Sequence, residues 1–336
     1  MEKKRVTLDN VAEAAGVSRA TASRALTGAG PASAEVRARV TQAAQALGFT
    51  PNHAARALAS NRAHAIALVI PEPNALVLTD PFLGGMITGV SEAFHDTGYQ
   101  LILVIVRPDE GWAKAGRLLQ DSYVDGAIVV SHHRGLLDQA MVHHPAPMVF
   151  VGRPGEAETA FYVDVDNTTG GRLAAQRLLD RGAQRIACVA GPADMTPVID
   201  RVAGWQAVLE SAGVTPGPIA HEPFTLVGGV QAMRRLLEQD PDIDGVFAQS
   251  DLMAAGAIEV LQEHGKSVGQ DVFIVSVDDS ELAHTTRPHL TSVTNPSAEL
   301  ALRASRMLLR ILDEDADISD VPPEIVTPQL VVRDSA

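Results

Sequence analysis

The sequence predicts a small all-α headpiece followed by an α/β core made of two doubly wound, parallel-sheet lobes. Three short helical patterns, each ended by a glycine, fill the first fifty residues. From Ala65 onward, short apolar runs alternate with amphipathic segments of helical period. Such alternation is typical of βαβ units in a mostly parallel sheet, and its two successive series indicate two similar lobes.

The headpiece helices are identified by their caps and by their spacing of apolar residues. Serine precedes two of them, where its hydroxyl can accept a hydrogen bond from a free backbone N–H group. In the first helix, Val11, Ala12 and Ala15 share one face. The expected bounds are Thr7-Leu8 to Gly16, Arg19 (after the cap Ser18) to about Leu26, and Ser33 to Gly48.

The core elements are identified in the same way. Seven apolar runs predict buried strands at Ala65–Ile70, Leu101–Val106, Gly126–Val130, Met148–Val151, Ile186–Ala190, Gly245–Ala248 and Val272–Val277. Amphipathic segments between them predict helices at Leu83–Thr97, Gly170–Arg181, Arg201–Ala212, Gly228–Glu238 and Leu252–His264.

Composition excludes several classes of protein. The chain has 336 residues, 46% of them hydrophobic, which is enough for two or three compact units. It contains no apolar run long enough to span a membrane, and the basic N-terminus lacks the apolar stretch of a secretory signal. The single cysteine, Cys188, excludes an intramolecular disulfide and a multi-cysteine metal cluster. We therefore expect a soluble, cytoplasmic protein without membrane contact.

Charge is distributed unevenly along the chain. The net charge is −14, yet the first 64 residues hold nine basic and four acidic side chains. A small basic unit on a large acidic body suggests a polyanion-binding module joined to a unit of another kind.

The segment from Leu8 to Leu26 meets the requirements of a helix-turn-helix. Ala12 is small enough for a helix crossing, and Gly16 suits the turn. The exposed face of the second helix then carries short polar groups and two guanidinium groups, which fit a major groove. The spacing alone does not exclude an ordinary αα-hairpin.

These segments, taken together, resemble the lactose/galactose-repressor (LacI/GalR) family of transcriptional regulators. The resemblance covers almost the whole chain in order: Val6–Leu26, Ala46–Asn52, Asp80–Phe82, Val163–Asn167, Ala190–Pro192, Arg201–Trp205, Ser250–Ala257 and Val277–Asp279. The chain departs from the family at Ala22, where relatives usually carry Val, at Ser250, where many carry Asn, and in the long segment before Asp80, which shapes the mouth of the pocket.

The resemblance implies which residues contact DNA. In the headpiece these are Thr7, Ser18, Arg19, Ala20, Thr21, Ser23 and Arg24, and in the following hinge they are Asn52, Ala55, Leu58 and Ala59. Arg19 can bind guanine in a bidentate manner, although a phosphate contact is the alternative. In relatives the leucine that corresponds to Leu58 inserts into the minor groove; the alternative is that residues 51–62 form a plain linker.

The resemblance also implies a sugar pocket in a periplasmic-binding-protein-like core. Phe82 and Phe224 match aromatic positions that offer a flat face to a sugar ring. Charged groups that hold hydroxyls match Arg153, Arg201 and Asp278, with Asp80 and Ser250 nearby.

The expected organisation is a headpiece at 1–50, a hinge at 51–62 and a core at 64–336, with lobe one at about 64–165 and 295–322 and lobe two at about 166–294 and 323–336. We expect a homodimeric, sequence-specific regulator, most simply a repressor. Its partners are double-stranded operator DNA and a small effector of the carbohydrate class. We expect no catalytic residue, cofactor or metal. The alternative is a cytoplasmic binding protein or enzyme on the same scaffold that does not recognise an operator.

Overall fold

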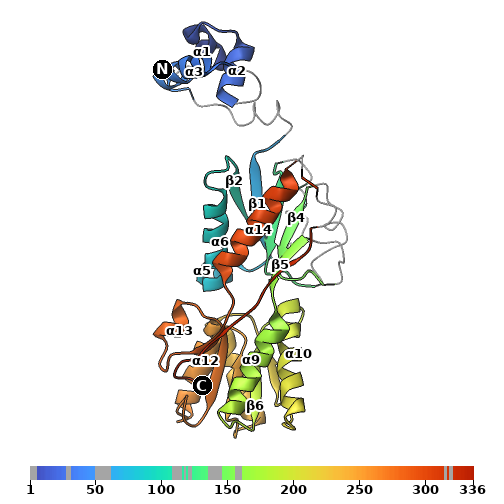
Figure 1. Cartoon of the computed structure of the whole chain (residues 1–336). Coiled ribbons are helices and arrows are strands. Elements are labelled where there is room, and N and C mark those ends of the chain that lie inside the picture. The colour runs from blue at the N-terminus through green and yellow to red at the C-terminus, as the bar shows by residue number, and fades with distance from the viewer. Residues whose placement is uncertain are drawn as a thin grey trace. The chain divides into compact units, whose positions relative to one another are not determined.

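The computed structural model describes residues 6–27, 32–49, 62–107, 116, 119, 123–134, 146–155, 161–313, 316–317 and 321–336. The chain divides into two compact units, Met1–Ala63 and His64–Ala336. Figure 1 shows both units, which are described separately below. No described helix is long and apolar enough to cross a membrane.

The first unit contains three helices, α1 (Leu8–Ala15), α2 (Arg19–Thr27) and α3 (Ala34–Leu47). Gly16 ends α1 with a left-handed φ of +63°, a conformation that glycine adopts without strain. Val11, Ala22 and Val40, one from each helix, are fully buried. The small Ala22 thus belongs to the centre of this core.

Lobe one is built on a six-stranded parallel sheet. Its strands are β1 (Ala65–Ile70), β2 (Gln100–Ile105), β3 (Gly126–Val130), β4 (Met148–Val151), β5 (Phe161–Val165) and β11 (Glu324–Val326), in the order β11-β5-β4-β3-β1-β2. Its helices are α5 (Asn74–Thr79), α6 (Pro81–Phe94) and α14 (Ser297–Leu312). Figure 1 shows α14 crossing the face of this sheet beside α6. The segment before Asp80, whose form the sequence left open, contains the short helix α5.

Lobe two repeats the same topology. Its strands are β6 (Ile186–Ala190), β7 (Ile219–His221), β8 (Gly245–Ala248), β9 (Phe273–Asp278), β10 (Thr291–Thr294) and β12 (Leu330–Val331), in the order β12-β10-β9-β8-β6-β7; only β12 is antiparallel to its neighbour. The helices are α9 (Asn167–Asp180), α10 (Thr196–Ser211), α11 (Leu226–Gln239), α12 (Asp251–Glu263) and α13 (Glu281–Thr285). α9 and α10 cover one face of the sheet, and α11 and α12 cover the other.

The chain crosses between the lobes three times in the described residues: after β5, after β10 and after β11. The sequence-based boundary, at which the chain returns to lobe two near residue 323, lies too early in the chain. Glu324–Val326 pairs in parallel with β5, so it extends the sheet of lobe one. The third crossing therefore lies between Val326 and Leu330. The sequence did not reveal this, because a three-residue strand at a sheet edge has no clear apolar period.

Candidate functional site

A cavity lies where the carboxyl ends of the two parallel sheets meet. In each sheet the first strand has neighbours on both sides, so β1 and β6 mark the points at which the winding of the sheet reverses. Open α/β sheets bind ligands at such points. Six of the seven predicted ligand residues line the cavity, namely Asp80, Phe82, Arg201, Phe224, Ser250 and Asp278.

Arg201 is the cationic group of the cavity. It lies in α10, its residue is only 6% exposed, and burial lowers the pKa of its guanidinium. Its Nε donates to Asn167 Oδ1 at 2.8 Å, and its Nη1 donates to the backbone oxygen of Gln249 at 3.1 Å. These contacts fix the plane of the guanidinium and leave its remaining N–H groups available for an acceptor on a ligand.

Asp278 faces Arg201 from the end of β9. Burial raises the pKa of its carboxyl well above the ordinary value, the charges of Asp251 and Asp80 act in the same direction, and Arg201 opposes them. Asn295 Nδ2 donates to Asp278 Oδ1 at 3.0 Å. The φ of Asp278 is +111°, which is unfavourable for any residue other than glycine. Strain of this kind is most often kept at functional positions.

Asp251 supports the turn that carries Asp278. Its carboxylate accepts hydrogen bonds from Ser276 Oγ at 2.6 Å, from Ser292 Oγ at 2.9 Å, and from both the N–H and the Oγ of Ser280 at 2.8 Å. These donors come from β9, β10 and the start of α13. One buried carboxylate therefore ties together the segments on either side of the strained turn.

Two further carboxyl groups reach the cavity from lobe one. Asp80 caps α6 by accepting from the N–H of Phe82 at 2.9 Å, and Asp164 accepts from the N–H groups of Arg153 and Val165 at 3.0 and 2.7 Å. Burial raises the pKa of each to about 6, against the lowering effect of these backbone hydrogen bonds. The lining thus contains three carboxyl groups and one guanidinium.

Aromatic and neutral polar groups complete the lining. The ring of Phe224 lies so close to Gly191 that a Cβ there would be 2.2 Å from the ring. Ser250 Oγ accepts from the N–H of Met253 at 3.2 Å, which leaves its own hydrogen free to donate. The Oε1 atom of Gln249 is buried and has no protein partner. Such an orphaned acceptor suits a ligand hydroxyl.

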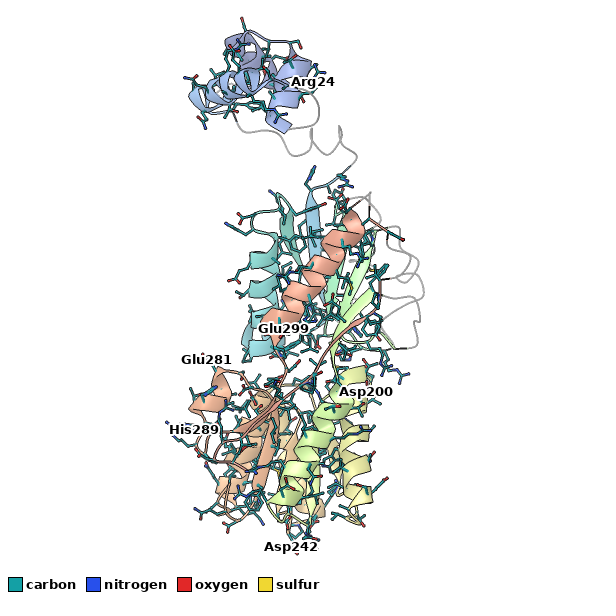
Figure 2. The ribbon with its side chains drawn as sticks, in the orientation of Figure 1. Arg24, Asp200, Asp242, Glu281, His289 and Glu299 are labelled. Atoms are coloured by element: carbon teal, nitrogen blue, oxygen red, sulfur yellow. The ribbon has the colours of Figure 1, made fainter. Side chains whose placement is uncertain are left out.

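Arg153 takes a place that the sequence did not predict. It is absent from the cavity lining, and its Nη2 donates to both carboxylate oxygens of Asp200 at 2.9 and 2.7 Å. Figure 2 shows Asp200 at the end of α10 that faces lobe one. Arg153 therefore joins the two lobes beside the cavity instead of lining it.

Sequence reasoning missed several lining residues. They lie at or just after the carboxyl ends of parallel strands and include Ser131, His132, Asp164, Asn167, Gln249 and Asn295. His132 is buried, its Nε2 lies 3.1 Å from the backbone oxygen of Gly152, and burial lowers its pKa to about 4. The position directly after a predicted strand was the available signal for Ser131, His132 and Gln249.

In the headpiece, α2 presents most of the predicted DNA-binding residues on one surface. Ser18, Arg19, Ala20 and Arg24 are exposed, Thr21 and Ser23 are half-buried, and Ala22 and Ala25 point into the core. Thr7 is exposed at the start of α1, where its N–H donates to Asn10 Oδ1 at 3.0 Å. Arg19 Nε lies 3.5 Å from Asp9 Oδ1. The hinge residues Asn52, Ala55, Leu58 and Ala59 lie outside the described residues.

Two family models match the chain. Residues 7–52 match bacterial regulatory proteins of the lacI family, and residues 175–336 match the periplasmic binding protein-like domain.

Individual proteins match along almost the whole length. The HTH-type transcriptional regulator CelR of Thermobifida fusca is 38% identical, and the alignment covers 99% of each chain. A ribose operon repressor of Halalkalibacterium halodurans is 33% identical over 98% of this chain and 96% of that one. A CelR–cellobiose complex superimposes with a TM-score of 0.77 at 36% identity, covering 99% of this chain and all of that one. The lac repressor dimer bound to operator and the anti-inducer ONPF superimposes with a TM-score of 0.86 at 24% identity, covering 99% of each chain, which supports the fold.

Proposed function

Because the chain belongs to the lacI family of bacterial regulatory proteins and is a DNA-binding transcriptional regulator, not an enzyme, we propose that it represses transcription under the control of a neutral sugar. The sugar binds in the cavity between the two lobes and sets the affinity of the headpiece for operator DNA. The observation that carries this proposal is the cavity itself, whose lining combines Arg201 and Asp278 with the aromatic side chains of Phe82 and Phe224.

The cavity chemistry favours a neutral polyol. Sugar hydroxyls donate to carboxylates and accept from guanidinium groups, and Asp80, Asp164, Asp278 and Arg201 supply both kinds of partner. An anionic effector would meet three carboxyl groups and one guanidinium, so charge disfavours sugar acids and sugar phosphates. The relative CelR was solved with cellobiose, so a gluco-disaccharide is our first candidate.

The headpiece chemistry favours reading of the major groove. Arg19 and Arg24 extend from the exposed face of α2, and short side chains between them allow close approach to the bases. Arg19 serves base recognition, and Ser18, Thr21 and Ser23 serve phosphate contacts. The exposed ion pair between Arg19 and Asp9 contributes little to stability, so Arg19 can exchange Asp9 for DNA at a small cost in free energy.

The proposed assembly is a homodimer on a pseudo-palindromic operator, since a two-fold protein matches two half-sites. We assign Asn52, Ala55, Leu58 and Ala59 to the operator contacts by their match to the family alone, with Leu58 as the minor-groove wedge. Because the target is chromosomal DNA, the protein acts in the cytoplasm.

Gel shifts with the region upstream of its own gene test the proposal, with and without cellobiose. We expect salt-sensitive binding that cellobiose alters and gluconate does not. Calorimetry with cellobiose on the full chain separates effector binding from DNA release. DNA binding that does not depend on salt, or the absence of binding, would remove the operator half of the proposal. Failure of neutral sugars to bind would remove the effector half.

A further inference from the structure

A histidine bridges the two lobes at the rim of the cavity. His133, in the loop after β3 of lobe one, lies between Glu72 of the same lobe and Asp194 of lobe two. Its Nδ1 is 2.9 and 3.0 Å from the two carboxylate oxygens of Asp194, and its Nε2 is 3.3 Å from Glu72 Oε1. The backbone N–H of Arg134 also donates to the backbone oxygen of Asp194 at 2.9 Å.

This bridge connects opposite walls of the cavity. His133 directly follows Ser131 and His132, which line the cavity from lobe one, and Asp194 directly precedes Met195, which lines it from lobe two. Glu72 is itself held, because Ser131 Oγ donates to its Oε1 at 2.7 Å. The separation of the lobes would therefore break the contacts to Asp194 and leave those to Glu72.

The charges around His133 favour its protonated form. The pKa of His133 is raised to about 9, chiefly by the hydrogen bond to Glu72; the hydrogen bond to Asp194 also raises it, and partial burial acts against both. The imidazole of His132, the preceding residue, is buried with a pKa of about 4 and stays neutral at pH 7. With both nitrogens protonated, His133 donates to a carboxylate on each side.

We infer that His133 is a positioning residue of the effector site: with Asp194 it forms a charged bridge that holds the two lobes in the arrangement that creates the cavity. This inference rests on the proposed function. The free energy of effector binding therefore includes the free energy of the bridge, because only the joined arrangement presents both walls of the cavity to the sugar.

The pH dependence follows from the raised pKa. The pKa of His133 is higher when the lobes are joined than when they are apart. Protonation of His133 therefore stabilises the joined arrangement in full at pH values below the pKa that it has with the lobes apart. The effect is lost as the pH rises through about 9, the pKa in the joined arrangement. A second bridge, Arg153 with Asp200, also joins the lobes. Its guanidinium keeps its charge throughout this range, so it does not produce the same dependence.

The first test measures cellobiose affinity by calorimetry on the full chain between pH 6.5 and 10. His133→Gln and Asp194→Asn should each weaken cellobiose binding by up to roughly tenfold at pH 7. This factor corresponds to a difference of about one unit between the pKa of His133 with the lobes joined and its pKa with the lobes apart. The double variant should be no weaker than either single one. Wild-type affinity should fall above pH 9, and His133→Lys, which stays charged, should restore binding and flatten the profile. His289→Gln is the matched control, because His289 pairs with Asp334 within lobe two.

The second test needs no effector. Spin labels at Glu92→Cys in lobe one and Gln239→Cys in lobe two, both exposed positions, report the distance between the lobes in the ligand-free full chain; Cys188 is buried and not readily labelled. We expect longer or broader distances in His133→Gln and Asp194→Asn. If the wild-type protein does not bind cellobiose, the proposed effector is wrong, but the distance measurement still tests whether His133 and Asp194 hold the lobes together. Unchanged distances, or unchanged affinity in variants that bind cellobiose, would overturn the inference.

Discussion

Replacement of Asp278 by asparagine should weaken effector binding and at the same time stabilise the ligand-free protein. The carboxyl is buried near Asp251 and Asp80, and both burial and these charges disfavour its ionised form. Asparagine removes the buried ionisable group, keeps an oxygen that can accept from Asn295, and tolerates positive φ better than most residues. The substitution therefore removes a functional acceptor and a source of electrostatic strain together.

The two effects have different sizes. Because burial favours the neutral carboxyl, its hydrogen bond to a sugar hydroxyl contributes about 0.5–1.5 kcal/mol, so the dissociation constant for cellobiose should rise by roughly 2- to 12-fold. Relief of strain at a functional site typically stabilises a protein by about 0.5–2 kcal/mol. For a large domain each kcal/mol raises the Tm by about 2–4 °C.

Calorimetry with cellobiose and thermal unfolding of the ligand-free full chain measure these effects. Asp240→Asn is a suitable control, because Asp240 forms an ion pair with Arg185 in lobe two and does not line the cavity. We expect the control to bind cellobiose like wild type and to gain no stability. A lower Tm for Asp278→Asn together with unchanged affinity would show that Asp278 is structural and that the effector binds elsewhere.

Three further predictions concern the headpiece, the packing of lobe two and the effect of acid. Arg19→Ala should relax selectivity at one base pair per half-site by ~1–3 kcal/mol in selections from randomised operators; the same consensus in mutant and wild type would make it a phosphate contact. Gly204→Ala should lower the Tm, because a Cβ there would lie 2.0 Å from the backbone oxygen of Thr168, whereas Gly84→Ala, with nothing within 4 Å, should raise it slightly. Asp80 and Asp164 titrate near pH 6, so cellobiose affinity should fall below that pH, while the contribution of the two groups to the stability of the ligand-free protein should rise. Calorimetric titrations in buffers of different ionisation enthalpy would reveal the protons that the two carboxyl groups release when cellobiose binds.

The sequence predicted the central strands because they are continuous apolar runs. Ala65–Ile70 and Ile186–Ala190, for example, have the expected bounds and are buried along their whole length. It did not predict β10, whose sequence is Thr-Ser-Val-Thr. Thr291 and Ser292 are fully buried only because Ser335 and Asp251 provide hydrogen-bond partners from distant segments. A polar strand of this kind is stable only in its tertiary context, which local patterning does not contain.

The same distinction applies to the site. The residues that line the cavity could be predicted where a family motif occurs, as at Asp278 at the end of β9 and at Arg201 in α10. Arg153 was misplaced because a pairing with Asp200 depends on how the lobes meet. No local pattern indicated the role of His133, since Glu72 and Asp194 lie 61 residues away on either side. Pairings across lobes are fixed by topology and have no periodic signal.

The unequal chemistry of the cavity explains why a sugar can act as an effector. The ligand-free site holds three carboxyl groups, one guanidinium and the orphaned Oε1 of Gln249. Burial opposes ionisation of those carboxyls, so the site is costly to maintain while it is empty. A polyol can form hydrogen bonds with groups from both lobes at once, Asp80 from lobe one and Asp278 from lobe two. The free energy gained depends on the lobes being joined, and this dependence is what allows a small neutral molecule to shift the equilibrium between two lobe arrangements.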